Sequence, residues 1–372
     1  MPTAAPLSTP SRSSVREMAD LTPASRDRSV DLLRAGAIAV VVLWHWVFSV
    51  THRNPAGNFT MPNPLAGVPG SWALTWVLQV MPLFFVIGGY ADLAAWTSAE
   101  RRGDGTVAFL RSRARRLLLP PAVMVAAWSA FETGRVLLFP GSRSIVTWGT
   151  AVFVPLWFLA IYAVTTALVP LTVRLHRRFG WRAAAVLVAA PLAVDRVRTA
   201  GAGWLAVPGT ILVFVTCHQL GYLWRDRQIA RPAALAAGAA AVLGVLTTVG
   251  GYDRSMVAVP GGTSNMFPTT VCIAVLGALQ LGLVLWARPV LERIAARRRV
   301  WLAVIGVNGV AMTIFTWHMT AWMVAALAWE RLIGPLGAAA DTGWWLTRPV
   351  WVILPGMVLV ALVATFQRLE RR

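Results

Sequence analysis

The chain has 372 residues, of which 57% are hydrophobic and only 13% are charged, and its mean hydropathy is +0.63. This composition excludes an ordinary soluble globular enzyme and indicates a protein that lies mostly in lipid. The formal net charge of +19 comes from arginine alone, since the sequence has no lysine. These arginines are spread over many short loops and do not form one basic face, which argues against nucleic-acid binding.

The amino-terminal segment differs in composition from the rest of the chain. Residues 1–28 are rich in Ser, Thr, Pro, Ala and Arg and contain no apolar core. A cleaved secretory signal needs such a core. We therefore expect a disordered cytoplasmic tail over residues 1–28 and one transmembrane domain over residues 29–372.

Apolar runs of about 20 residues, the length of helix that crosses a hydrocarbon core, follow one another along this domain. Connections rich in arginine alternate with connections poor in it, and the excess marks the cytoplasmic side. The sequence therefore predicts an all-α, polytopic integral membrane protein with about ten transmembrane helices and both termini in the cytoplasm. The ten runs cover approximately residues 30–50, 72–96, 117–139, 154–174, 182–199, 204–224, 232–249, 267–287, 302–328 and 343–366.

The first apolar run carries two cationic side chains, Arg34 and His45, eleven residues apart. At 100° and about 1.5 Å per residue, they share one helix face and lie about 16 Å apart along the axis. Asp31, three residues before Arg34, is within reach of its guanidinium. The first helix is therefore predicted to carry a polar stripe across the membrane.

Ionisable groups inside a span are costly to bury and are functional by default, although hydrogen bonding between helices is the structural alternative. Neutral histidine is a natural general base near pH 7, and arginine suits bidentate phosphate contacts. Arg34 at the inner end and His45 further out fit transfer from a cytoplasmic phosphorylated donor to an outer acceptor.

Three further polar residues in the apolar runs are candidates for the same site. Glu132 is expected near the depth of His45, where it could orient the imidazole; a local pair with Arg135 is the competing interpretation. His318 and Asn308 lie in the ninth run and fit an acceptor pocket or hydrogen bonds between helices. The cysteines, Cys217 and Cys272, lack CxxC spacing, so we expect no disulfide and no bound metal.

Several segments resemble the acyltransferase-3 family of integral membrane acyltransferases. RSVDLLRA followed by His45 is similar to its first span, whose signature is an arginine and a histidine separated by ten residues. FLRSRARRLLLP, residues 109–120, carries Arg113 and Arg116 in the spacing of the family's paired arginines. Weaker similarities are MPLFFVIGGY at 81–90, VPLWFLAIY at 154–162, which contains Trp157, and IFTWHM at 314–319 with the late histidine.

The resemblance implies an acyl-coenzyme A donor, expected to be acetyl-coenzyme A, bound from the cytoplasm by Arg34, Arg113 and Arg116. It implies O-acylation of a saccharide, glycolipid or other hydroxyl acceptor at the outer half of the plasma membrane, expected to be a bacterial inner membrane. His45 would be the general base, with Glu132 beside it. The acceptor would contact His318, Asn308 and Trp157. The chain departs from many relatives at Gly88, where they carry a serine.

Other functions use the same residues. A multi-span transporter could employ the polar stripe as a substrate or proton path, although no inverted repeat is evident. A structural or sensory membrane protein would not need the stripe. The arginines between Arg101 and Arg116 could also be ordinary positive-inside anchors.

Overall fold

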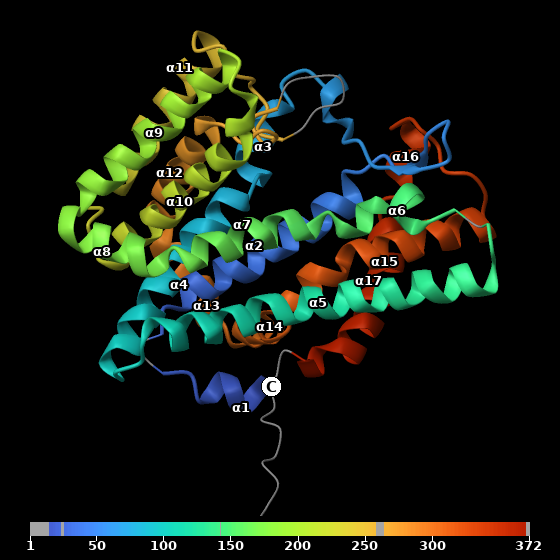
Figure 1. Cartoon of the computed structure of the whole chain (residues 1–372), viewed down its shortest axis with the longest axis horizontal. Helices are drawn as coiled ribbons and strands as arrows, with labels where there is room; N and C mark the ends of the chain where they lie inside the picture. The colour runs from blue at the N-terminus through green and yellow to red at the C-terminus, as the bar shows by residue number, and fades with distance from the viewer. Residues whose placement is uncertain (1–14, 24–25, 142, 258–263, 370–372) are drawn as a thin grey trace, which may run out of the picture.

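The computed structural model is almost entirely helical, and it describes residues 15–23, 26–141, 143–257 and 264–369 (Figure 1). One two-stranded antiparallel ribbon, β1 (His52–Arg53) with β2 (Phe59–Thr60), pairs His52 with Thr60. The helices are α1 (Val15–Asp20), α2 (Arg28–Val47), α3 (Trp72–Leu78), α4 (Met81–Arg101), α5 (Thr106–Leu138), α6 (Ile145–Trp148), α7 (Pro155–Ala167), α8 (Val169–Phe179), α9 (Trp181–Thr199), α10 (Ala206–Arg225), α11 (Pro232–Thr248), α12 (Val271–Trp286), α13 (Arg288–Ala296), α14 (Arg298–Gly309), α15 (Ala311–Leu332), α16 (Thr342–Leu346) and α17 (Val350–Phe366).

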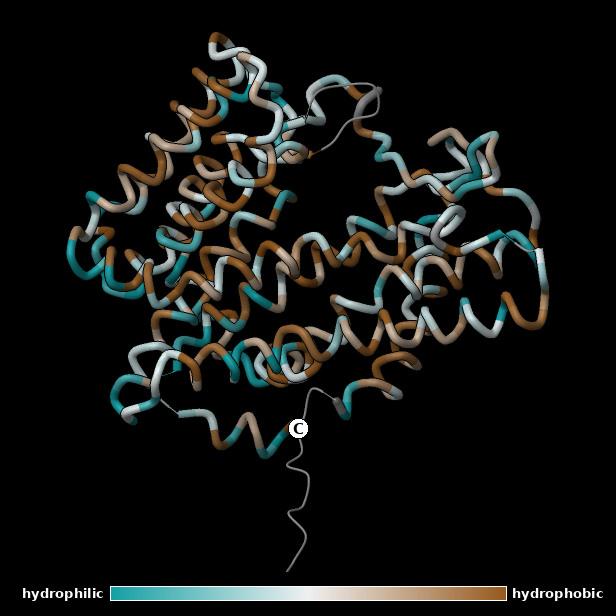
Figure 2. Tube along the Cα trace, viewed as in Figure 1, coloured by the Kyte–Doolittle hydropathy of each residue, from teal (hydrophilic) through white to brown (hydrophobic). Residues whose placement is uncertain are grey.

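The long helices have the length and hydropathy of membrane spans. Within the described residues, six helical segments meet both criteria, and a seventh does if α12 and α13, bent by 63° to each other, form one span. Two shorter apolar helices, α11 and α17, accompany them. Figure 2 shows apolar residues along the long helices and hydrophilic residues gathered at turns such as that between α8 and α9. The protein is therefore an all-α, multi-pass membrane protein; ten spans and cytoplasmic termini stay predictions.

Part of the amino-terminal segment is ordered against the bundle, which differs from the expectation of a disordered tail over residues 1–28. The helix α1 packs on α14 and buries Ala19 in a small apolar cluster with Trp301. Asp20 forms an ion pair of 2.7 Å with Arg298, and this hydrogen-bonded guanidinium lowers the pKa of the Asp20 carboxyl. The short apolar face of α1 packs on α14, and the composition of the segment alone does not reveal this contact. Residues 1–14 lie outside the described residues.

Glycines let α4 and α10 cross at close range. A Cβ atom at Gly89 would meet the carbonyl of His218, and one at Gly221 would meet the carbonyl of Val86. Small residues are what allow membrane helices to approach backbone to backbone. This crossing fixes the position of α4, which also carries residues of the candidate site, among them Phe84, Gly88 and Asp92.

Candidate active site

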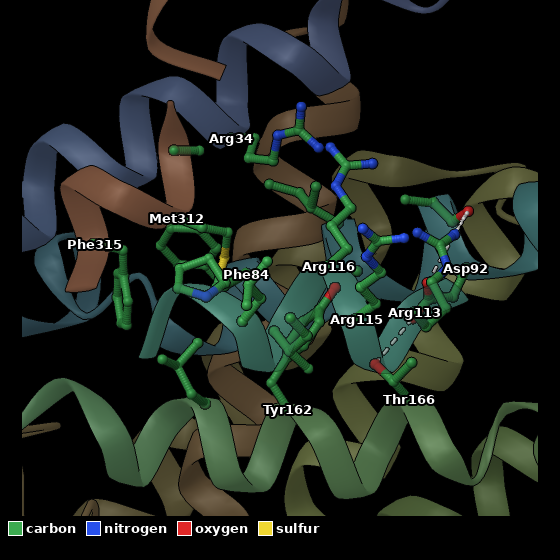
Figure 3. Close-up of a pocket in the computed structure, with 18 of the residues that line it drawn as sticks. Arg34, Phe84, Asp92, Arg113, Arg115, Arg116, Tyr162, Thr166, Met312 and Phe315 are labelled. Carbon is green, nitrogen blue, oxygen red and sulfur yellow. Dashed lines mark hydrogen bonds and ion pairs between the residues drawn. The ribbon is translucent and has the colours of Figure 1, made fainter. Parts of the chain in front are cut away.

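A large cavity opens among α2, α4, α5, α7, α14 and α15, with a volume of about 820 Å³. Sites for small molecules and cofactors have volumes of this order. Figure 3 shows that its two sides differ in chemistry: Arg113, Arg115 and Arg116 lie toward one side, and Met312 and Phe315 toward the other. The cavity therefore has a cationic end and an apolar end.

The cationic end depends on the first turns of α5. Ala108, Arg111, Ser112, Arg115 and Leu119 line the cavity, and their spacing of three and four residues places them on one face of the helix. Arg113 and Arg116 flank this face and line the cavity as well. The segment RSRARR thus presents its cations to one space and not only to the membrane surface.

Arg34 joins these cations from α2. Its Nε atom donates to Oδ1 of Asn308 over 2.8 Å, and its Nη2 atom lies 3.4 Å from Asp31, which confirms the predicted contact between Asp31 and Arg34. The Nδ2 atom of Asn308 donates to the carbonyl of Asp31 over 2.9 Å. The structure thus places Asn308 at the cationic end beside Arg34, a position that the sequence analysis did not anticipate.

Arg113 is held by a buried carboxylate. Its Nη2 atom lies 3.1 Å from Oδ1 of Asp92, while Oδ2 of Asp92 lies 3.2 Å from Nε2 of His218 and accepts from Thr166 over 3.4 Å. Asp92 is not among the site residues predicted from the sequence, because its position near a span end is also that of ordinary interfacial residues. Within the described residues, no ion pair joins Arg111, Arg115 or Arg116 to an acid.

His45 and His318, both predicted to belong to the site, contact each other. Nε2 of His318 lies 3.3 Å from Nδ1 of His45, and the ring centroids are 5.1 Å apart. Trp46 donates to the carbonyl of His318 over 3.1 Å, which ties α2 to α15 at the same level. His318 is fully buried, whereas His45 is partly exposed.

Hydrogen bonds to carbonyls fix the tautomers of this pair. Nδ1 of His318 is 2.7 Å from the carbonyl of Phe315, and Nδ1 of His45 is 2.8 Å from that of Val41. A carbonyl only accepts, so each neutral ring carries its hydrogen on Nδ1 and a lone pair on Nε2. Nε2 of His318 can then accept from Nδ1–H of His45. No hydrogen bond within the described residues uses Nε2 of His45, so the lone pair of that atom is unused.

The histidine pair lies just beyond the apolar end of the cavity. Phe315 lines the cavity, and its ring centroid is 5.8 Å from that of His318. On α2, Arg34 and Ile38 line the cavity, and His45 lies on the same side of the helix two turns further on. The polar stripe predicted from the sequence therefore runs from the cationic end past the apolar end to the histidines.

Glu132 does not join this pair. Its carboxylate accepts from Nε and Nη2 of Arg135 over 2.9 and 2.8 Å and from the backbone of Ile145 over 3.3 Å. This is the local pair that the sequence analysis gave as the competing interpretation. The expected contact between Glu132 and His45 is replaced because an arginine one turn away and the following loop satisfy the carboxylate.

Trp157 lies on α7 next to the cavity but does not line it, whereas other residues of the same helix do. The Trp157 ring packs against Phe214 and Phe267, with centroids 6.2 and 5.1 Å away. Phe158 and Tyr162 of the same helix face the cavity. Tyr162 is a site residue that sequence reasoning missed, since a tyrosine in an aromatic run carries no distinctive spacing.

The geometry agrees with one family comparison. The family model described as an acyltransferase domain, that of the acyltransferase-3 family, matches residues 27–366. The chain belongs to the acyltransferase-3 family. No curated protein and no solved structure matches the chain. As a member of this family, the protein is a multi-pass membrane acyltransferase, and the cavity and the histidine pair both lie within the matched region.

Proposed function

We propose that this acyltransferase-3 protein moves an acyl group from cytoplasmic acyl-coenzyme A to a hydroxyl acceptor presented at the outer half of the membrane. The observation that carries the proposal is the arrangement of the cavity. It has arginines at one end, and its apolar end adjoins the pair of His318 and His45, in which Nε2 of His45 keeps an unused lone pair. This is the arrangement that a phosphorylated, acylated donor and a base-catalysed transfer require.

The cationic end supplies the donor site. Arg34, Arg111, Arg115 and Arg116 can hold the phosphates of coenzyme A through charge-assisted hydrogen bonds, and Arg113 contributes while it is held by Asp92. The acyl-pantetheine arm then extends along the stripe of α2 toward Phe315. The acyl group reaches the end of the cavity nearest His45.

The histidine pair supplies the proton transfer. Nε2 of His45 takes the proton of the acceptor hydroxyl as the oxygen attacks the thioester carbonyl. The carbon–sulfur bond of the tetrahedral intermediate then breaks, and the leaving sulfur takes the proton back from His45, giving an ester and free coenzyme A. His318 keeps the imidazole in position and accepts from its Nδ1–H while His45 is charged.

The acceptor is proposed from family resemblance and from the predicted position of His45 in the outer half of the membrane. It is a saccharide, glycolipid or similar hydroxyl compound, the donor is acetyl-coenzyme A, and the site is the plasma membrane of a bacterium. O-acetylation of cell-envelope carbohydrate is the corresponding activity. Transfer is direct, because both cysteines, whose thiols a covalent route could use, are buried.

Labelled acetyl-coenzyme A tests the proposal. Membranes that contain the protein are incubated with the donor labelled in its acetyl group, and label in extracted lipids and saccharides is measured. We expect label transfer by the wild type, no transfer by His45→Ala, and weak donor binding by Arg34→Ala. Normal transfer by His45→Ala would reject the mechanism. Uptake of a solute that needs His45, without binding of coenzyme A, would favour a transporter.

A further inference from the structure

The apolar end of the cavity is lined by three phenylalanine rings from three helices. Phe84 of α4, Phe158 of α7 and Phe315 of α15 form this aromatic wall. Their ring centroids are 5.6 Å apart for Phe84 and Phe158, 4.9 Å for Phe158 and Phe315, and 6.5 Å for Phe84 and Phe315. All three side chains are at most 9% exposed, so the wall is a packed surface.

One ring of the wall, that of Phe315, lies between the cavity and His318. Phe315 contacts His318 on its far side through the ring separation of 5.8 Å, and neither histidine lines the cavity. Met312, one turn before Phe315, borders the same end (Figure 3). An acyl chain that extends along the apolar lining therefore meets these side chains.

The two ends of the cavity fix how deep the donor can lie. Its phosphates are held by arginines at one end, and its thioester must come to the end nearest His45 for the hydroxyl to attack it. The acyl chain is the part of the donor that extends beyond the thioester. In a close-packed wall, each added methylene group must displace an aromatic ring, which is unfavourable.

We propose that the aromatic wall limits the length of the transferred acyl chain and that Phe315, with Phe84, determines this specificity. The inference rests on the proposed function, because it takes the cavity as the acyl-coenzyme A site. The donor is thereby a short-chain acyl-coenzyme A. Removing the Phe315 ring opens space toward His318, while the backbone carbonyl that holds Nδ1 of His318 remains in place.

Donor binding can be measured without the acceptor. Full-length protein in lipid discs is titrated with coenzyme A and with its acetyl, butyryl and hexanoyl thioesters, against labelled coenzyme A, and binding to empty discs is subtracted. We expect hexanoyl-coenzyme A to bind the wild type at least about tenfold more weakly than acetyl-coenzyme A, given the effect of one methylene in a fitted pocket. In Phe315→Ala this ratio should fall to about one, with the Kd of free coenzyme A unchanged.

Two further variants keep the test decisive if Phe315→Ala does not fold. Phe84→Leu should also favour the longer chains, whereas Phe59→Leu is the matched control, because Phe59 is buried, does not line the cavity and packs against Trp148 and Trp322. Equal binding of all chain lengths by the wild type, or an equal shift in the Phe59→Leu control, would overturn the wall as the determinant. If neither coenzyme A nor any thioester binds the wild type, the proposed function itself fails.

Discussion

Nε2 of His318 lies 3.3 Å from Nδ1 of His45, although 273 residues separate the two in the chain. The contact joins α2 to α15, and Trp46 reinforces it by donating to the carbonyl of His318. In the proposed mechanism, His318 therefore positions His45 and does not itself touch the donor. This distinction separates the expected effects of its substitutions from those of His45.

Substituting His318 should lower turnover without weakening donor binding. His318→Ala removes one of the two acceptors of Nδ1–H of His45 and leaves the Val41 carbonyl in place. We therefore expect label transfer to fall about 10- to 100-fold, which is at or below the lower limit of the ~10²–10⁴-fold that acid–base catalysis contributes. His318→Gln should retain more activity, because its side-chain carbonyl can accept in place of Nε2. Transfer rates and the Kd of acetyl-coenzyme A are measured for both; a weaker Kd with unchanged turnover would contradict the positioning role.

Asp92 should be a main contributor to stability. It is 2% exposed and contacts both Arg113 and His218. Asp92→Ala therefore leaves these two side chains without the carboxylate that they contact. Breaking a buried pair from one side costs about 3–5 kcal/mol, which should appear as a large drop in the midpoint of thermal unfolding in lipid discs. Asp104→Ala is the control, since Asp104 pairs with Arg102 at an exposed position worth at most about 1 kcal/mol. Equal midpoints for the two variants would contradict the buried network.

Gly88 should be required for the shape of the cavity. A Cβ atom there would lie 2.7 Å from the hydroxyl oxygen of Tyr162 and 2.9 Å from its ring, so in Gly88→Ala the Tyr162 side chain, which lines the cavity, must shift. We expect a several-fold rise in the Kd of acetyl-coenzyme A. Gly36→Ala on α2 is the matched control, because no atom of the described residues outside the adjoining turns of α2 lies within 4 Å of the added methyl group, and alanine favours a helix by about 1 kcal/mol. An unchanged Kd in Gly88→Ala would show that Tyr162 can move away from the donor.

Glu132 should be dispensable for catalysis. Its carboxylate is occupied by Arg135 and the backbone of Ile145, so Glu132→Gln should change the rate of label transfer by no more than about twofold, in contrast to the acid–base effect expected at His45. The same assay on His45→Ala gives the reference for full loss. A loss in Glu132→Gln as large as that in His45→Ala would restore its sequence-based role as the partner of the base.

The hydropathy and the local spacing of residues predicted the fold class and the polar face of the first helix. Hydropathy indicated a helical membrane protein, because a lipid environment requires long apolar helices with internally satisfied backbones. Helical periodicity placed Arg34, Asp31 and His45 on one face, since that depends only on residues within a few turns. The paired arginines Arg113 and Arg116 and the first-span signature indicated the acyltransferase-3 family.

The contacts between helices were decided only by the tertiary structure. The sequence named His45 and His318 separately, but their pairing, like that of Asp92 with Arg113, depends on which helix faces pack together, and no local pattern encodes this. Glu132 was assigned to His45 and not to Arg135 because the sequence gives the depth of a residue along a span but not the direction in which its helix face points. Tyr162 and the aromatic wall went unnoticed for the same reason: aromatic residues that pack and aromatic residues that shape a site look alike until their neighbours are known.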